Sequence, residues 1–271
     1  MKRYSIFHVP VLSFFSRSLY YDVCHRWKGT GFGYLFLLLA VCWIVPIVKL
    51  HERLSAFVEN EAPKVVSQIP VVTIAGGRLS IDEPQPYYIY GPDMREKLVV
   101  IDATGAVTSL EDADTVVLIT ETGATFKKSD LETRTISFRE IDDFSLDQET
   151  ITNWLRIGKS SIPPVFYVFA VLGSFSGRIV QILVYGGIGL VFASMLKSRL
   201  AYTALMRIAV VAVTPCILVK TVLSACEITV PFAGFWYFLA AMFFLFFGVK
   251  AASQDEASVG ATDPWRVQRG M

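Results

Sequence analysis

Four long apolar blocks constrain the fold of this chain more than any other feature of its sequence. The first block, residues 31–48, holds 18 residues without a charge. A helix rises about 1.5 Å per residue, so this block approaches the roughly 20 residues that cross a hydrocarbon core of about 30 Å. Three more blocks follow, at 162–196, 208–225 and 230–249. Charged residues make up 18% of the chain, against about 25% in soluble domains, and the sequence predicts a membrane α-helical bundle with about four transmembrane helices.

The number of crossings depends on how the second block is interpreted. Arg178 interrupts that block. The block crosses once, with residues 163–177 at the outer interface or extending the helix outward, or it splits into a hairpin, which makes five crossings. Four crossings are favoured, because a hairpin would leave Lys197 and Arg199 outside. The first block is interpreted as a retained span, since about 30 residues precede it and no small-residue cleavage site follows it.

The distribution of charge sets the expected orientation. Residues 51–162 hold 11 Lys or Arg and 19 Asp or Glu, a net charge of −8, whereas the rest of the chain has a net charge of +9. Residues 1–30 and the link at 197–207 are basic. We therefore expect both termini and this link on the cytoplasmic side, and residues 51–162 on the extracytoplasmic side.

Residues 1–30 are predicted to form a cytoplasmic or interfacial amphipathic segment. Within 10–28, apolar residues at near-helical spacing are interleaved with basic ones. One interpretation places this helix on the inner leaflet, with its aromatic rings at headgroup depth. The other packs it on the cytoplasmic end of the bundle, and the sequence does not choose between them. Gly29 and Gly31 permit a sharp turn into the first span.

Three short strings in this amino-terminal region carry a family resemblance: SFF at 13–15, SLYYDV at 18–23 and KGTGFGYL at 28–35. They resemble the opening of an uncharacterised bacterial integral membrane family, domain of unknown function 1189, which is distantly Yip-like. The layout of the remaining chain agrees, including the Thr214-Pro215 step in a later apolar block. The resemblance implies an integral protein of the bacterial cytoplasmic (inner) membrane. The family has no established reaction, so it implies no catalytic residue.

Residues 51–162 are predicted to form an extracytoplasmic β-rich domain with flanking helices. Paired glycines at 76–77 are typical of a tight hairpin turn between two strands. Turn residues and alternating patterns predict a small antiparallel sheet structure of five to seven strands over about 65–142. Pro63 is expected to end a helix continuing from the first span. Ser145, with Gln148 three residues later, predicts the cap of a helix over 147–157 that ends at Gly158.

The sequence gives no support for metal, cofactor or nucleic-acid binding. Its four cysteines and three histidines lie apart, without the spacing of a metal site. No phosphate-binding loop or dinucleotide motif is present, and the basic residues do not gather into a stripe. Asp102 is interpreted as the cap of a turn, and the acidic residues 111–114 as a solvated turn. We expect the protein not to be an enzyme.

Charged residues inside the apolar blocks are the sharpest candidates for function, because charge at bilayer depth is costly and often marks a pathway or a pair. They are Arg178, Arg207 and Lys220. Each has a simple interpretation as an interfacial anchor whose long side chain reaches water. The alternative is that Arg178 and Lys220 form an anion or lipid contact near the outer leaflet. Glu227 is expected on the same helical face as Lys220.

Five glycines in the second block are expected to pack helices closely. Small residues four apart let helix backbones approach, as in the GxxxG spacing of Gly173 and Gly177. The segment is not a hydrolase nucleophile elbow, since its central residue is Phe175. The other three expected packing positions are Gly186, Gly187 and Gly189.

The leading hypothesis is a non-enzymatic protein of the cell envelope that binds a partner or ligand through residues 65–142, for sensing, scaffolding or assembly. The alternative is a lipid- or small-solute-handling protein that uses the outer-leaflet basic site. The sequence does not predict an oligomeric state. The expected domain layout begins with an amphipathic segment at 1–30 and a first span at 31–50. The β-rich domain follows at 51–162, then three further spans at 163–250 and a cytoplasmic polar tail at 251–271.

Overall fold

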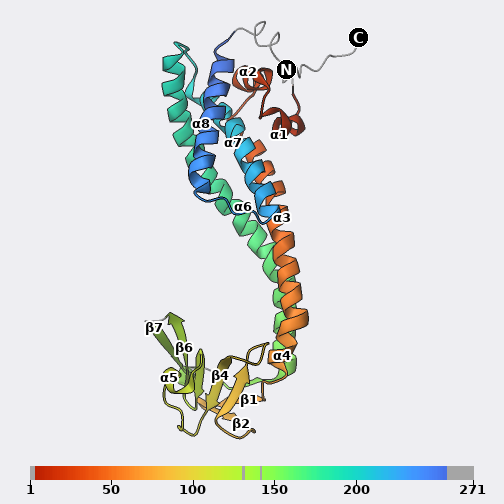
Figure 1. Cartoon of the computed structure of the whole chain (residues 1–271), viewed down its shortest axis with the longest axis vertical. Helices are drawn as coiled ribbons and strands as arrows, with labels where there is room; N and C mark the ends of the chain where they lie inside the picture. The colour runs from red at the N-terminus through yellow and green to blue at the C-terminus, as the bar shows by residue number, and fades with distance from the viewer. Residues whose placement is uncertain (1–3, 130–131, 141, 255–271) are drawn as a thin grey trace. The chain divides into compact units, whose positions relative to one another are not determined.

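The computed structural model of the chain describes residues 4–129, 132–140 and 142–254. The predicted polar tail lies outside the described residues from position 255 onward. The chain divides into two compact units (Figure 1). The helical unit consists of Met1–Lys49 and Pro164–Met271, and the β unit consists of Leu50–Pro163.

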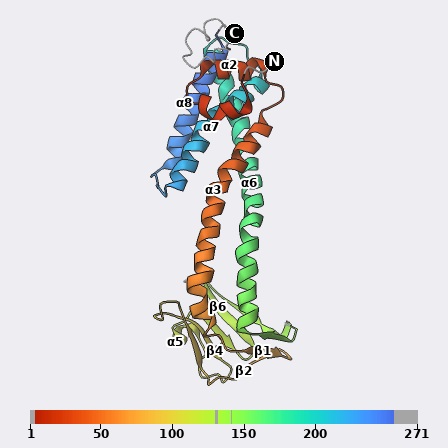
Figure 2. The same ribbon diagram turned by 90° about the vertical axis from the view of Figure 1, so that its right-hand side faces the viewer.

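Within the described residues, four helices are long and apolar enough to cross a membrane. Each contains most or all of one of the four apolar blocks, and α7 and α8 lie side by side in the helical unit (Figure 2). The four helices are α3 Phe32–Ala56, α6 Gln148–Met195, α7 Tyr202–Ala225 and α8 Ala233–Ala252. The core of the helical unit is centred on α7, whose residues from Ile208 to Val213 are fully buried.

Helix α6 is continuous over 48 residues. The prediction of a separate helix ending at Gly158 is therefore wrong, and residues 163–177 extend the second apolar helix. A glycine inside a helix costs only about 1 kcal/mol relative to alanine, which the rest of a long helix outweighs. Ser145 is not the cap of this helix, because it lies in a strand opposite Thr73. Asp147 takes that role, since its Oδ1 accepts from the backbone N–H of Thr150 at 2.8 Å.

The helical run that begins with α3 passes through Pro63. A wide turn of π-helix, Phe57–Glu61, is followed by the short helix α4 Ala62–Val66. The prediction that Pro63 ends the helix is wrong, because Pro63 lies in the first turn of α4, where a missing N–H leaves no hydrogen bond unmade. The run as a whole extends over 35 residues.

The amino-terminal segment packs on the bundle of the helical unit. It contains a 3₁₀ turn, Ile6–His8, the short helix α1 Val9–Leu12 and helix α2 Arg17–Arg26. Helix α2 contacts α7 and α8, and its side chains Leu19, Tyr20 and Val23 are fully buried. Of the two interpretations that the sequence left open, the structure therefore adopts the packed helix.

Arg207 of α7 holds the carboxyl end of α2. Its Nη2 donates to the carbonyl of Cys24 at 2.7 Å and its Nη1 to the carbonyl of Gly29 at 3.3 Å. Terminal helix carbonyls lack intrahelical partners and carry partial negative charge, so a guanidinium is a favourable partner there. Gly29 and Gly31 then take positive φ angles of +77° and +81°, which allows the predicted sharp turn into α3.

The β unit contains two sheets, with strand orders β2-β1-β8 and β3-β4-β5-β6-β7. Their strands are β1 Val72–Ala75, β2 Arg78–Ile81, β3 Tyr87–Tyr90, β4 Lys97–Asp102, β5 Val117–Thr120, β6 Gly123–Ser129, β7 Glu132–Ser137 and β8 Phe144–Leu146. The β1–β2 hairpin turns at Gly76 and Gly77, both at positive φ, as predicted.

The sheet topology differs from the predicted antiparallel arrangement in two ways. Strands β4 and β5 pair in parallel, with Val99 opposite Val117, and the crossover between them contains helix α5 Leu110–Ala113. Parallel strands need such a crossover, and the acidic turn predicted at 111–114 is part of it. Second, seven strands lie within 65–142, as predicted, but the described residues also form an eighth, the short strand β8, just beyond that range.

Strand β4 links the two hydrophobic clusters of the β unit. Ile101 packs with Val72 and Ile74 in one cluster, whereas the neighbouring Val100 packs with Leu118 in the other. Successive residues of a strand point to opposite faces, so β4 contributes to both clusters. Its last residue is buried and begins a turn that its carboxylate closes.

Asp102 is the last residue of β4, and the prediction that it caps a turn is confirmed. Its carboxylate accepts from the backbone N–H of Thr104 at 2.9 Å, from the Thr104 hydroxyl and from the backbone N–H of Val107 at 2.6 Å. Asp102 is 1% exposed. These part-buried hydrogen bonds satisfy the buried carboxylate.

Candidate basic site in the helical unit

Two of the positive charges within the apolar helices are candidates for a binding site, and no carboxylate lies beside them. Arg178 is on α6 and Lys220 is on α7. The apolar parts of the four helices, residues 32–48, 164–195, 202–225 and 233–252, contain no Asp or Glu. The described residues of these segments therefore offer no acidic partner for either charge.

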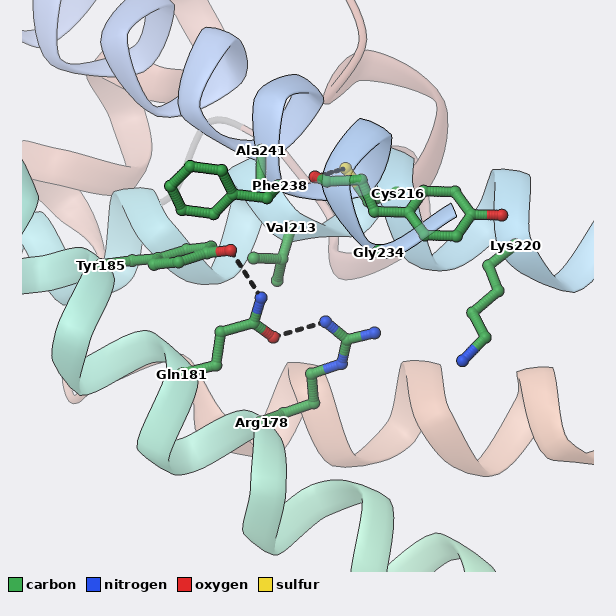
Figure 3. Close-up of a pocket in the computed structure, with 10 residues that line it drawn as sticks. Arg178, Gln181, Tyr185, Val213, Cys216, Lys220, Gly234, Phe238 and Ala241 are labelled. Carbon is green, nitrogen blue, oxygen red and sulfur yellow. Dashed lines mark hydrogen bonds between the residues drawn. The ribbon is translucent and has the colours of Figure 1, made fainter. Parts of the chain in front are cut away.

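Arg178 and Lys220 both line the same two cavities, each several times larger than the roughly 30 Å³ that a water molecule occupies in the liquid. The first, here the polar cavity, has a volume of about 210 Å³ and lies among α6, α7 and α8. The second, here the apolar cavity, has a volume of about 240 Å³ and lies among α3, α6 and α7. Figure 3 shows the Arg178 guanidinium and the Lys220 amine directed into the polar cavity.

A short hydrogen-bond chain positions Arg178. One Nη donates to Oε1 of Gln181, and Nε2 of Gln181 donates to the hydroxyl of Tyr185 at 2.8 Å (Figure 3). The three residues lie on one side of α6, three and four positions apart. Arg178 is half-buried and Lys220 is exposed. Among the described residues, no hydrogen-bond partner is found for the Lys220 amine, so it remains available for a ligand.

The acidic residue predicted near Lys220 is engaged elsewhere. Helix α7 ends at Ala225, and Glu227 follows with a positive φ of 58°. Its carboxylate lies 3.2 Å from Nζ of Lys49, which also donates to the carbonyl of Ala225 at 2.6 Å. Glu227 thus pairs with Lys49 of α3, and the predicted alignment with Lys220 does not produce an ion pair.

The third predicted charge, Arg207, lies apart from both cavities, because its guanidinium holds the end of α2. Sequence reasoning also missed Gln181 and Tyr185, which complete the polar cavity. Their spacing from Arg178 on one helical face was the available signal. Cys216 and Cys42 line the polar and apolar cavities respectively. Among the described residues, no group of three or more His, Cys, Asp or Glu could hold a metal ion.

The five glycines predicted to pack helices have different surroundings. A Cβ added to Gly186 would lie 3.0 Å from Tyr202, and one added to Gly189 would lie 3.4 Å from Leu205. Both glycines thus lie where α6 approaches α7 closely. At the remaining three positions a Cβ would meet no described atom within 4 Å, and their packing role stays a prediction; they are Gly173, Gly177 and Gly187.

The fold and the basic site define a class of protein. It has four apolar helices of membrane-spanning length, the cations Arg178 and Lys220 in cavities between these helices, and a separate β unit. Residues 7–249 match the family model described as protein of unknown function (DUF1189). Because this match covers most of the chain, the chain belongs to that family. The match does not bear on the Yip-like grouping, which stays a prediction.

A curated relative is the "Uncharacterized protein RP489" of Rickettsia prowazekii (strain Madrid E). It is 26% identical over 121 residues, which cover 41% of this chain and 42% of the relative. The match thus spans about two fifths of the length of that relative. No solved structure matches the chain.

Proposed function

We propose that this protein binds an anionic ligand between its membrane helices, at Arg178 and Lys220. The observation that carries the proposal is that both cations line the same two cavities, whose described lining contains no carboxylate. Removing an ion from water costs several kcal/mol per ion after relaxation. An anion placed between the two cations offsets part of that cost and forms charge-assisted hydrogen bonds with both.

The proposed role is therefore the handling of a lipid or small solute, which was the alternative hypothesis from the sequence. Binding of an envelope partner through residues 65–142 stays a prediction, since no contact among the described residues and no relative bears on it. The basic site gives the lipid- or solute-handling role a structural basis that the partner-binding role lacks.

We further propose that the protein crosses the bacterial inner membrane four times with both termini in the cytoplasm. The support is the charge distribution: the β-rich segment 51–162 carries a net charge of −8 and the link after α6 is basic. Positive charge near short loops is retained on the cytoplasmic side. Residues 51–162 are then extracytoplasmic.

Labelling of single cysteines with a membrane-impermeant maleimide tests this orientation. In a chain with Cys226→Ser, we expect Asp112→Cys to react in cells with a permeabilised outer membrane. Lys197→Cys is expected to react only after the inner membrane is disrupted. The reverse pattern would show that the orientation is wrong.

Anion binding is tested with the purified full chain in a neutral detergent. The probes are inorganic phosphate, glycerol phosphate and phosphatidylglycerol, and the measurement is the shift in thermal unfolding temperature. At least one probe is expected to stabilise the wild-type chain. Arg178→Gln with Lys220→Gln is expected to weaken that binding by about tenfold or more, because a hydrogen bond to a charged group contributes about 1.5–3 kcal/mol.

Lys250→Gln is the matched control. It removes one exposed positive charge from the same unit, at the end of α8 and away from both cavities. Arg178→Lys is a second comparison, since it keeps the charge and loses the planar fork of donors. A shift of equal size in wild type and the double variant, or no shift with any of the three probes, would refute the anion site.

A further inference from the structure

We infer that the ligand of this site is an anionic phospholipid-type amphiphile, with its phosphate held between Arg178 and Lys220. Its apolar chain would enter the apolar cavity and its polar headgroup the polar cavity. This inference rests on the proposed function and specifies the chemical class of the ligand.

The two cavities differ in the chemistry of their walls. The apolar cavity is lined by carbon-rich side chains from three helices, among them Leu39, Trp43, Pro46 and Ile217. The polar cavity is lined by Gln181, Tyr185 and Tyr237 in addition to apolar residues of α7 and α8, so its wall is mixed. The described residues common to both linings are Arg178 and Lys220. The cations therefore lie where the two chemical environments meet.

Hydrogen bonds within the protein make the apolar cavity more apolar than its composition suggests. The indole N–H of Trp43 donates to the hydroxyl of Ser174 at 2.9 Å. The indole therefore lines the cavity with its N–H already paired. The hydroxyl of Thr221 donates to the carbonyl of Ile217 in its own helix at 2.9 Å. With these donors satisfied, a hydrocarbon chain meets few unpaired polar groups there.

The polar cavity retains hydrogen-bonding capacity for a headgroup. The hydroxyl of Tyr185 accepts from Gln181, and no acceptor for its proton is found among the described residues. Hydroxyl groups of a glycerol or sugar headgroup both donate and accept, which suits this wall. The guanidinium and the amine supply the fork and the point charge that bind phosphate oxygens.

An inorganic anion or a neutral lipid would match only part of this site, which consists of an apolar cavity, two cations and a polar cavity. An inorganic anion would contact the two cations but leave the apolar cavity unoccupied by hydrocarbon. A neutral lipid would fill the apolar cavity but leave both charges without a counter-charge. An anionic phospholipid has the matching sequence of parts: hydrocarbon, phosphate, polar headgroup.

The test compares three probes on the purified full chain in dodecyl maltoside by native mass spectrometry and thermal unfolding: phosphatidylglycerol, phosphatidylcholine and inorganic phosphate. We expect phosphatidylglycerol to bind at least about tenfold more tightly than phosphatidylcholine or inorganic phosphate. Arg178→Gln is expected to remove this preference over phosphatidylcholine. The comparison with inorganic phosphate separates a lipid headgroup from a free anion.

A variant that obstructs the apolar cavity provides a second test that distinguishes binding of a lipid from binding of a free anion. Ser224 lines this cavity and is exposed, so Ser224→Phe adds a ring near the cavity without overpacking the core. We expect it to weaken phosphatidylglycerol binding by about tenfold and to leave inorganic phosphate binding unchanged. Ser176→Phe, at an exposed position of α6 that lines neither cavity, is the control.

Three results would overturn the inference or a part of it, each in a different way. Equal affinity for inorganic phosphate and phosphatidylglycerol, with both dependent on Arg178, would overturn the lipid assignment and leave the anion site intact. Binding of phosphatidylglycerol that does not depend on Arg178 or Lys220 would overturn both proposals. Unchanged phosphatidylglycerol binding in a folded Ser224→Phe variant would exclude the apolar cavity as the chain site.

Discussion

Gly248→Ala is expected to destabilise the helical unit by about 1–3 kcal/mol, the usual cost of overpacking a core. Gly248 lies on α8, and an added Cβ would be 2.5 Å from Cδ1 of Tyr20 and 2.7 Å from Cγ2 of Ile208. Real Cβ atoms do not approach other atoms so closely, so α2 or α8 has to move.

The Tyr20 ring cannot easily move away from an added Cβ at position 248. Its ring is fully buried, its edge packs on Phe247 with ring centroids 5.6 Å apart, and its hydroxyl donates to the carbonyl of Ser13 at 2.8 Å. Moving the ring would break this hydrogen bond and open a void beside α7. The cost therefore falls on the contact between α2 and the bundle.

Thermal unfolding of the full chain in detergent measures the loss, and labelling of Cys24 on α2 locates it. Cys24 is 4% exposed, and burial raises the pKa of its thiol to about 11, an effect that nearby Arg207 partly offsets. We expect slow labelling in the wild type and faster labelling in Gly248→Ala. Gly173→Ala is the control, because a Cβ there meets no described atom within 4 Å. Equal stability of the two variants would contradict the prediction.

Asp102→Ala is expected to destabilise the β unit by about 1.5–3 kcal/mol, because it removes the charged acceptor of several hydrogen bonds in a part-buried turn. The donors are the backbone groups of Thr104 and Val107. The turn they close joins β4 to the crossover that leads to β5. Loss of the carboxylate therefore affects the parallel pair as well as the turn.

The contribution of Asp102 also depends on pH. Burial alone raises its pKa, but hydrogen bonds from the Thr104 side chain and from the backbone of Val107, Thr104 and Ala106 outweigh burial and hold the pKa below its ordinary value. A lowered folded-state pKa means that the stabilisation is present above the unfolded-state pKa of about 3.9 and is lost as the pH falls through the folded-state value. Asp102→Asn should lack this pH dependence.

Hydrogen exchange of the full chain, corrected for the intrinsic effect of pH, measures both effects in peptides covering β4 and β5. Asp102→Ala is expected to show faster exchange at neutral pH, and the difference should shrink at acid pH. Asp82→Asn is the control, because Asp82 is exposed and lies outside the turn that Asp102 closes. Unchanged exchange in Asp102→Ala at neutral pH would show that the turn closed by Asp102 does not stabilise the sheet.

The four long helices were predictable because hydropathy is a local property. Each predicted block lies in one helix, and the described bounds differ mainly where polar residues continue the helix, as at 148–161 of α6. The hairpin at Gly76 and Gly77 was predictable for a similar reason, since its turn chemistry lies in adjacent residues. Strand β8 was not, because three residues carry too little pattern to be recognised.

The pairing of charges was only partly predictable. Arg178 and Lys220 stand out in the sequence because charge is rare in apolar blocks, and the structure brings both to the same cavities. The partners of Glu227 and Arg207 were not predictable, because Lys49 and the carbonyl of Cys24 are 178 and 183 residues away along the chain. Such pairs depend on how the helices pack.

The sequence by itself determined the number and positions of the apolar blocks, the acidic β-rich insertion and the candidate cations Arg178 and Lys220, since each follows from composition over a short window. The tertiary structure decided that α2 packs on the bundle, that β4 and β5 run parallel, and that the cations lie between a polar and an apolar cavity. These features arise from contacts between residues far apart in the chain, whose geometry depends on side-chain volume and packing rather than on local pattern.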